Sequence, residues 1–463
     1  MKSVKRFMTG LLCTALLAGA FAGCGSRDAE DGPSETGNEV ENQTGSETGS
    51  ETESETGDDG GESREDSVEN TGAGTESAGE EKETASGEEE ALQIPEVNIA
   101  SFDLPDSEAL QFVHNMKIGW NLGNTFDAIN DSFTGDELEL ESSWCGIKTT
   151  AEMLADIKEA GFNSVRIPVS WHNHVDEDWQ ISEVWLNRVQ EVVDYAYDNG
   201  MYVILNIHHD NSEDFLYPDS AHLEQSVGYV TTIWKQLGQR FQDYDEHLIF
   251  ECMNEPRLVG SQYEWWLNPG AEECKDAVSC INEINQAFVN TVRESGGNNG
   301  TRYLMVPGYC ASPDGVLNSG FVLPEDAEGV ENRLILSVHA YTPYNFALQG
   351  EGESGSKTEF DSDSAASVRD IDSFMDQLYR QYIGKGIPVI IGEFGSRDKS
   401  GNLQSRIDHA TYYIAAARAR GITCFWWDNN AFSGNGENFG IYYRRQGKFL
   451  YPDILNGLMK YAD

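Results

Sequence analysis

The chain has 463 residues, and its 79 acidic residues outnumber 31 Lys and Arg, which gives a formal net charge of −48. So acidic a chain is poorly suited to nucleic acid, and an uncharged substrate fits it better. Length alone suggests two or three domains at roughly 150 residues each. Composition corrects that count, because residues 1–96 differ in kind from the rest.

Residues 1–23 are typical of a secretory signal peptide. Basic residues precede an apolar run at 7–22, which is shorter than the roughly 20 residues of a membrane-spanning helix. The run ends Phe21-Ala22-Gly23-Cys24, which resembles a bacterial lipobox with Phe where Leu is usual. We therefore expect Cys24 to carry lipid, making the protein an extracellular cell-surface lipoprotein that touches the membrane only through this anchor. Ordinary cleavage near Gly23, which would release a secreted protein, is the alternative.

Residues 24–96 are predicted to be a disordered acidic tether. From Gly25 to Glu96 the chain is mostly Glu, Ser, Thr, Gly and Asp, with 24 acidic residues against three basic ones. Such a segment cannot bury enough apolar surface to offset its chain entropy. Like charges extend it, so we interpret it as a spacer that leads to one globular domain at 97–463.

Apolar strands alternate with amphipathic helices through residues 97–463. Strands are predicted at 117–122, 163–168, 202–208, 248–253, 303–306, 334–338, 388–392 and 422–427. Helices are predicted at 149–160, 183–199, 225–241, 277–295, 367–383, 404–420 and 451–461, with a poorly defined one after the fifth strand. Eight strands, each followed by a helical stretch, predict an α/β fold of the (β/α)8 TIM-barrel type. An open doubly wound sheet fits less well, because no G-x-G-x-x-G follows any strand.

Six cysteines lie within this domain. Cys252, Cys310 and Cys424 are in or beside predicted strands and are expected to be buried thiols. Cys274 and Cys280 are close enough in sequence for a local disulfide, although spacing alone does not establish one. The cysteine pattern contains no CxxC pair and so gives no sign of zinc.

Two glutamates follow two of the predicted buried strands. Glu255 lies in Asn254-Glu255-Pro256, where Pro256 cannot donate to a sheet and is expected to end the strand. Glu393 follows the strand 388–392. In a barrel the carboxyl ends of the strands carry the chemistry. A carboxyl pair about 5 Å apart hydrolyses a glycosidic bond with retention, one group protonating the leaving oxygen and the other attacking.

Other polar residues end further strands and converge on the same face. Arg166 and Tyr341 are expected to keep Glu393 ionised, Asn254 to bind a sugar 2-hydroxyl, and Trp427 to stack on a pyranose ring. His208 and His209 are adjacent on a predicted strand, so their side chains should point to opposite faces and not share a metal ion. His172 and His174 alternate correctly for one face, and substrate contact or loop structure is preferred there. We expect no metal and no cofactor.

These residues together resemble glycoside hydrolase family 5, which includes many bacterial endoglucanases, over residues 105–460. The motifs that carry the resemblance are Gly119-Trp120-Asn121-Leu122-Gly123-Asn124-Thr125, Arg166-Ile167-Pro168-Val169, His208, Asn254-Glu255-Pro256, His339-Ala340-Tyr341, Gly392-Glu393-Phe394-Gly395 and Trp427. The segments 254–260 and 296–299 look closest to the branch that also contains xyloglucanases and lichenases.

The resemblance implies a retaining mechanism with Glu255 as acid/base and Glu393 as nucleophile. It implies a −1 subsite lined by Arg166, His208, Asn254, His339, Tyr341 and Trp427, with the choice of Trp427 over Trp426 resting on one aligned position. It also implies that His209 and the region of Asn121 and Asp127 contact sugars on the non-reducing side.

The predicted function is therefore a monomeric retaining endo-β-1,4-glucanase that binds a β-glucan polysaccharide. The same chemistry on xyloglucan, mixed-linkage glucan, xylan or mannan is the first alternative, to be decided by the loops 259–274 and 342–360. In the first loop, Trp265 and Trp266 either form sugar platforms or pack the loop. A non-catalytic, surface-anchored glycan-binding barrel is the second alternative, disfavoured because both glutamates are present.

Overall fold

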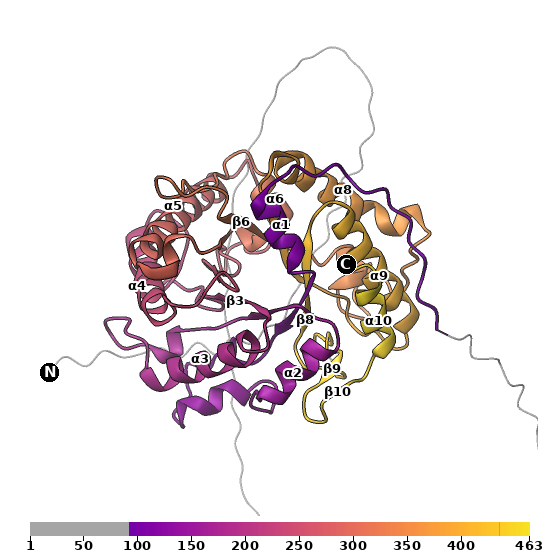
Figure 1. The fold of residues 1–463 in the computed structure, drawn as a ribbon, viewed down its shortest axis with the longest axis horizontal. Coiled ribbons are helices and arrows are strands. Elements are labelled where there is room, and N and C mark those ends of the chain that lie inside the picture. Colours follow the sequence, from indigo (N-terminus) through magenta and orange to yellow (C-terminus); the bar gives the residue numbers. More distant parts are fainter. Residues whose placement is uncertain (1–91, 435) are drawn as a thin grey trace, which may run out of the picture. The chain divides into compact units, whose positions relative to one another are not determined.

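The computed structural model describes residues 92–434 and 436–463. The predicted signal peptide, Cys24 and most of the predicted tether lie outside the described residues. Eight parallel strands close into a barrel in chain order (Figure 1). They are β1 (Ile118–Leu122), β2 (Ser164–Ile167), β3 (Tyr202–Asn206), β4 (Leu248–Glu251), β5 (Leu304–Pro307), β6 (Leu334–His339), β7 (Val389–Phe394) and β8 (Thr423–Asp428). The predicted TIM barrel is confirmed, and the open-sheet alternative is wrong.

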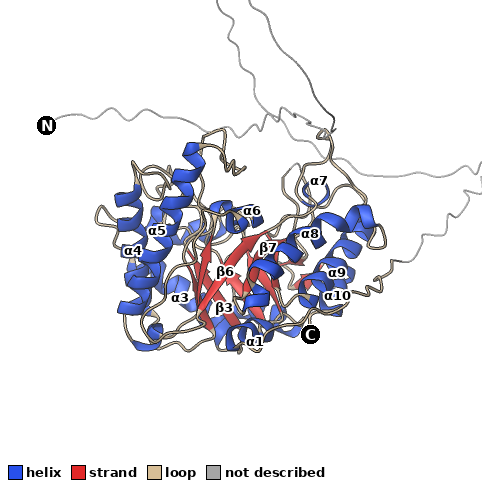
Figure 2. Cartoon of the chain, turned by 90° about the horizontal axis from the view of Figure 1, so that it is seen from above, coloured by secondary structure: helices blue, strands red, loops and turns tan. Residues whose placement is uncertain are grey.

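Helices lie on both sides of the strands in the view of Figure 2. They are α1 (Glu108–Asn115), α2 (Ala151–Glu159), α3 (Glu183–Tyr197), α4 (Leu223–Arg240), α5 (Glu272–Glu294), α6 (Pro313–Leu317), α7 (Tyr344–Ala347), α8 (Ala365–Gln381), α9 (Leu403–Ala419) and α10 (Pro452–Lys460). A small hairpin, β9 (Tyr442–Tyr443) with β10 (Lys448–Phe449), precedes α10. None of the described helices is both long and apolar enough to cross a membrane.

Helix α1, which was not among the predicted helices, packs against the N-terminal end of the barrel. Its apolar face, with Phe112 and Val113, lies against buried strand residues that form a cluster separate from the outer core. Those strand residues are Ile204, Ile249, Met305, Ile335, Ile390 and Phe425. They point into the barrel, whereas their sequence neighbours pack outward against the helices. Gly119 of β1 has to be glycine, because a Cβ there would lie 2.1 Å from the Phe425 ring.

The strand pleat fixes what lies above this apolar layer. Side chains alternate faces with a period of two, so residues two positions further along each strand also point inward. They are Asn121, Arg166, Asn206, Glu251, Pro307, Ser337, Gly392 and Trp427, most of them polar. The interior of the barrel is thus apolar at one end and polar at the carboxyl ends of the strands.

Strand β4 ends earlier than predicted. Its regular pairing stops at Glu251, five residues before Pro256, so Pro256 is not what terminates it. The chain still follows β3, since the Asn254 N–H donates to the Ile207 carbonyl at 2.8 Å. Asn254 and Glu255 therefore lie on an irregular extension above the strand, not at its tip, while Glu393 lies within β7.

The predicted end of the tether at residue 96 also differs from the structure. The segment 92–99 lies on the outer helices: Gln93 and Gln404 exchange two hydrogen bonds, and Glu96 pairs with Lys460 at 2.8 Å. Ile94 and Val97 pack against the core, which explains why these residues follow the barrel in spite of the acidic composition before them.

The cysteines of the described part are all free thiols. Cys252, Cys310 and Cys424 are buried as predicted, and Cys274 and Cys280 are buried without forming the disulfide that their spacing allowed.

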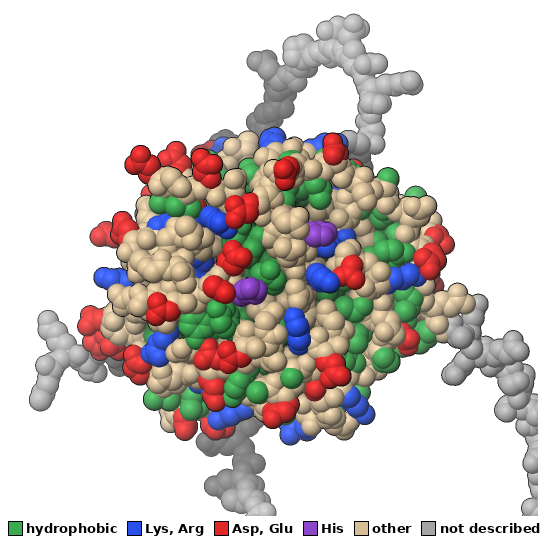
Figure 3. Space-filling model, viewed as in Figure 1, with side chains coloured by type: hydrophobic (Ala, Val, Ile, Leu, Met, Phe, Trp, Pro, Cys, Tyr) green, Lys and Arg blue, Asp and Glu red, His purple; other side chains and the backbone are tan. Residues whose placement is uncertain are grey.

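Acidic and basic side chains are interspersed over the face seen in Figure 3, with no contiguous basic surface there.

Arg302 is expected to stabilise the end of the barrel opposite the site. Its side chain is buried, and it donates to Asn299 and to the backbone carbonyls of 241, 244, 245 and 248. Arg302→Leu should cost about 3 kcal/mol or more of unfolding free energy, because several buried carbonyls lose their donors. Thermal unfolding would show this, with kcat of the folded fraction unchanged. Arg369→Leu, at an exposed arginine, should shift neither quantity.

Candidate active site

Arg166 of β2 connects the polar groups at the carboxyl end of the barrel. Its side chain is fully buried. Its Nε donates to Glu251 at 2.7 Å, and its terminal nitrogens donate to Asn121 at 3.1 Å, Glu393 at 2.8 Å and Asn254 at 2.7 Å. One guanidinium thus fixes four side chains from three other segments of the chain, which its rigid fork of donors suits.

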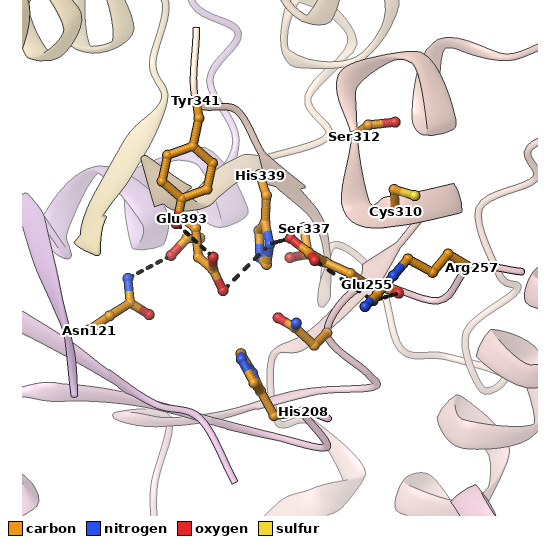
Figure 4. A network of polar contacts seen from close by, with 12 residues as sticks. Asn121, His208, Glu255, Arg257, Cys310, Ser312, Ser337, His339, Tyr341 and Glu393 are labelled. Atoms are coloured by element: carbon orange, nitrogen blue, oxygen red, sulfur yellow. Dashed lines mark hydrogen bonds and ion pairs between the residues drawn. The ribbon is translucent and has the colours of Figure 1, made fainter. Parts of the chain in front are cut away.

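Glu255 and Glu393 face each other across His339 (Figure 4). His339 Nδ1 lies 2.8 Å from a Glu255 oxygen and 3.6 Å from a Glu393 oxygen. One ligand atom from each of the three residues lies within 4.8 Å of the other two. The Tyr341 hydroxyl donates to the second Glu393 oxygen at 2.9 Å. The predicted contacts of Arg166 and Tyr341 with Glu393 are therefore present, and the carboxyl separation suits retaining hydrolysis.

The charges of this cluster are strongly coupled. Burial raises the pKa of Glu393 above its ordinary value, against the lowering effect of His339 and Arg166. Burial also acts to raise the pKa of Glu255, but the His339 hydrogen bond and the charges of His339 and Arg257 lower it overall. The pKa of His339 is lowered by burial and raised more strongly by the two glutamates. Taken alone, these directions favour a charged His339 beside an ionised Glu255.

The surroundings of His339 argue against that charged form and favour a neutral His339 beside a protonated Glu255. His339 Nε2 is buried without a hydrogen-bond partner, and a Cβ on Gly392 would lie 3.1 Å from it. A charged imidazole would bury an unpaired N–H at this point, which costs more than burying a lone pair. A neutral His339 that donates from Nδ1 leaves Glu255 protonated on its other oxygen, the form that a general acid needs.

Three polar residues that complete the network were not predicted. Glu251 is buried in β4 and accepts from Arg166, Asn206 and Ser337. Asn206 in turn contacts His208 Nδ1 at 3.2 Å. The available signal was a carboxylate inside the apolar run 248–253, two residues after Ile249 and hence on the inward face.

Trp427 and His208 lie side by side in the site. Their rings are parallel within 2°, with centroids 5.9 Å apart. Trp427 retains 7% exposure, whereas Trp426 is fully buried and donates to the Phe439 carbonyl. This difference in exposure agrees with the expectation that Trp427, and not Trp426, faces the site. Gly123 allows the Trp427 ring to lie here, since a Cβ on Gly123 would be 2.9 Å from that ring.

His208 and His209 lie close together, so the expectation that their side chains point to opposite faces was wrong. Regular pairing of β3 ends at Asn206, and beyond it the two rings approach to 4.3 Å between centroids. With Asp127 they offer three ligand atoms within 4.8 Å of one another. His208 Nδ1 is already used by the Asn206 amide, and both Asp127 oxygens accept backbone N–H groups. Because these ligand atoms already take part in hydrogen bonds, the three side chains form a poor metal site.

Asn121 and Asp127 occupy supporting positions, which corrects the expectation that they contact sugar. Both are fully buried. The Asn121 amide donates to the carbonyls of Gly392 and Trp426 and accepts from Arg166. Asp127 accepts from the N–H groups of 124 and 125 and holds the turn after β1, and burial raises its pKa to about 6. Neither side chain has polar surface left for a ligand.

His172 and His174 do not form a shared site. His172 Nδ1 lies 2.6 Å from the buried Asp210 carboxylate, while the His174 ring stacks on Trp185 with centroids 3.5 Å apart. Both histidines hold loops in place, which agrees with the loop-structure alternative.

The two tryptophans of the loop after β4 each contact one neighbouring side chain and remain largely exposed. Trp265 is 55% exposed and stacks on the Arg257 guanidinium at 4.0 Å, while Trp266 is 62% exposed and meets Tyr344 edge-on at 6.0 Å. Arg257 lies 3.9 Å from Glu255. The loop thus presents aromatic surface next to the carboxyl pair.

A closed (β/α)8 barrel with two facing glutamates above β4 and within β7 defines the class of barrel glycoside hydrolases. Within this class, residues 126–433 match the model of the cellulase family, glycosyl hydrolase family 5. The chain belongs to that family, which confirms the resemblance seen in the sequence.

Curated relatives include endoglucanase 1 of Ruminococcus albus, 42% identical over 384 residues that are 82% of this chain and 88% of that protein. Cellulase/esterase CelE of Acetivibrio thermocellus is 42% identical over 77% of this chain, but the match spans only 41% of its own length.

Among solved structures, a family 5 lichenase from Caldicellulosiruptor sp. F32 in complex with cellotetraose is 59% identical, with a TM-score of 0.79 over 81% of this chain and all of that one. A GH5-4 broad-specificity endoglucanase from Ruminococcus champanellensis with bound cellotriose is 44% identical, with a TM-score of 0.70 over 77% of this chain and all of that one.

Proposed function

We propose that the barrel is a broad-specificity endo-β-1,4-glucanase that cleaves internal bonds of cellulose-like and mixed-linkage β-glucans with retention of configuration. The observation that carries the mechanism is the approach of Glu255 and Glu393, whose oxygens lie within 4.8 Å. The relatives named as endoglucanases, and the lichenase crystallised with cellotetraose, support the substrate class.

In the first step, a Glu393 oxygen attacks the anomeric carbon while Glu255 gives its proton to the departing glycosidic oxygen. The bond to the leaving sugar breaks and an ester to Glu393 forms. In the second step, Glu255 takes a proton from water, whose oxygen attacks the same carbon and releases Glu393. Arg166 and Tyr341 hold the Glu393 oxygens in place. Asn254 is the proposed contact of the 2-hydroxyl, and His208, His209 and Trp427 the proposed contacts of the neighbouring sugars.

Product analysis on carboxymethylcellulose, lichenan, xyloglucan, xylan and mannan tests this proposal. We expect hydrolysis of the first two at least, with short internal-cleavage products and the β-anomer formed first. An α-anomer formed first would rule out retention. Binding of glucans without any hydrolysis would instead favour the non-catalytic barrel.

Glu255→Ala should separate the acid role from the rest of the mechanism. We expect hydrolysis of glucan to fall on the order of 10³-fold, because the sugar leaving group needs a proton. Aryl cellobiosides with acidic phenols should lose far less in their first step. Azide, which needs no base, should restore turnover and give a β-glycosyl azide. Absence of both effects would remove Glu255 from the acid/base role.

We also propose that the protein is exported and anchored through lipid on Cys24, with the segment 24–91 as the spacer to the barrel. Support comes from the apolar run at 7–22 and the lipobox-like end of that run. Labelled palmitate should enter the wild-type protein in a bacterial host, and Cys24→Ala should lose the label and be found in the medium. Label retained in Cys24→Ala would contradict the anchor.

A further inference from the structure

Glu251 is a third buried carboxylate of the site, with no part in the bond-making steps. Its Oε2 accepts from Arg166 Nε at 2.7 Å and from the Asn206 amide at 2.9 Å, and its Oε1 accepts from Ser337 at 2.5 Å. We propose that Glu251 is a positioning residue for hydrolysis with two roles. It pairs with Arg166 alongside the nucleophile Glu393, and through Asn206 it helps to fix the tautomer of His208. This proposal rests on the proposed function.

The first branch runs through Arg166 to Glu393. One guanidinium is paired with two carboxylates, with Glu251 at 2.7 Å and with Glu393 at 2.8 Å. An opposite charge at this distance strongly favours the ionised form of a carboxyl group. Because Arg166 also pairs with Glu251, its positive charge is only partly compensated by Glu393. Glu393 is therefore held in place while its carboxylate keeps enough negative charge to act as a nucleophile.

The second branch runs through Asn206 to His208. The Asn206 oxygen accepts from the Val169 N–H at 3.1 Å, and its amide nitrogen donates to Glu251. The reverse orientation would place an amide oxygen against a carboxylate and an amide N–H against the Val169 N–H, so Glu251 and Val169 together fix which way the amide faces. His208 Nδ1 therefore meets an N–H donor at 3.2 Å and must accept.

A neutral His208 then carries its proton on Nε2. Burial lowers the pKa of His208 well below its ordinary value, so the ring stays neutral. In Figure 4 the His208 ring points toward the space between the two catalytic glutamates. The tautomer that Glu251 helps to set through Asn206 thus makes His208 a hydrogen-bond donor to a sugar and not an acceptor.

Glu251→Gln isolates the charge from the hydrogen bonds. The Gln oxygen can accept from Arg166 and Asn206, and the Gln nitrogen can donate to Ser337. With its charge removed, Arg166 acts on Glu393 alone, and the acidic limb of the kcat/KM profile should move down by roughly half to one pH unit. The other titratable or charged groups facing Glu393 are unchanged by this substitution: Arg166, Glu255, His339, Tyr341 and Glu437.

Glu251→Ala removes the hydrogen bonds as well. We expect kcat to fall on the order of 10²-fold with KM changed much less, because Arg166, Asn254 and His208 lose their fixed positions. Glu141→Gln is the matched control: Glu141 is also fully buried and bonded twice to an arginine, Arg188, away from the site. It should lower the unfolding temperature and leave the pH profile in place. An unshifted acidic limb in Glu251→Gln would overturn the proposal.

A measurement on the wild-type protein does not depend on any variant folding. Imidazole 15N spectra should show His208 with Nε2 protonated and Nδ1 bare across the active pH range. A His208 protonated on Nδ1 would overturn the relay through Asn206. If the wild-type protein hydrolyses no β-glucan, the proposed function fails, and comparing these spectra with those of Glu251→Ala still decides whether Glu251 controls the His208 tautomer.

Discussion

Glu393→Gln is expected to lower kcat on β-glucans by on the order of 10⁴-fold or more, because the neutral amide offers no carboxylate oxygen to attack the anomeric carbon. The barrel should remain folded. Arg166 keeps its 2.7 Å pair with Glu251, and the Gln oxygen can still accept from the same guanidinium. Parallel measurements of kcat and thermal unfolding would show a large loss of the first with little change in the second.

Tyr341→Phe provides the matched control for that variant. It removes one 2.9 Å hydrogen bond to Glu393 but keeps the attacking oxygen. We expect a loss of about 10- to 100-fold, much smaller than that of Glu393→Gln. A 2-deoxy-2-fluoro cellobioside should also trap the wild-type enzyme on the peptide that carries Glu393. Label on another residue, or normal turnover by Glu393→Gln, would contradict the nucleophile assignment.

The barrel could be predicted from the sequence because its strands are buried on both sides. Such strands appear as short apolar runs, and glycines such as Gly161, Gly200 and Gly421, all with positive φ, mark the ends of the helices between them. Placing Glu255 and Glu393 together needed only the rule that polar residues after parallel strands meet at one face. These steps use local sequence alone.

The interior network needed more than local sequence. Glu251 lies in a run of residues that all look buried. It differs from Cys252 only in whether its side chain points into the barrel or outward to the helices. That direction depends on where regular pairing ends, and β4 and β3 both end earlier than their apolar runs do. The same error gave the wrong separation of His208 and His209, since the pleat no longer alternates beyond Asn206.

The expected sugar contacts of Asn121 and Asp127 failed for a related reason. The family motif identified the right segment, but not which of its side chains remain free. The Asn121 side chain is hydrogen-bonded to Arg166 and to two backbone carbonyls, and the Asp127 carboxylate accepts from two backbone N–H groups. Hydrogen bonds between distant segments decide this, and a single sequence does not reveal them.

Arg166→Met should harm both folding and catalysis, for separable reasons. Removing the guanidinium leaves Glu251 and Glu393 buried without their cation, which should cost roughly 3–5 kcal/mol of unfolding free energy. The Asn254 side chain also loses its 2.7 Å donor. We expect a clear fall in the denaturation midpoint and at least about a 10²-fold loss of kcat.

Adding Glu251→Gln to Arg166→Met distinguishes the two causes. The double variant no longer buries an unpaired Glu251 charge, so it should recover part of the lost stability. It should recover little of the lost activity, because Glu393 and Asn254 still lack their donor. Arg188→Met, which breaks the buried pair with Glu141 outside the site, should lower stability and spare kcat. If activity returned in step with stability in the double variant, Arg166 would act on folding alone and not on the position of the nucleophile.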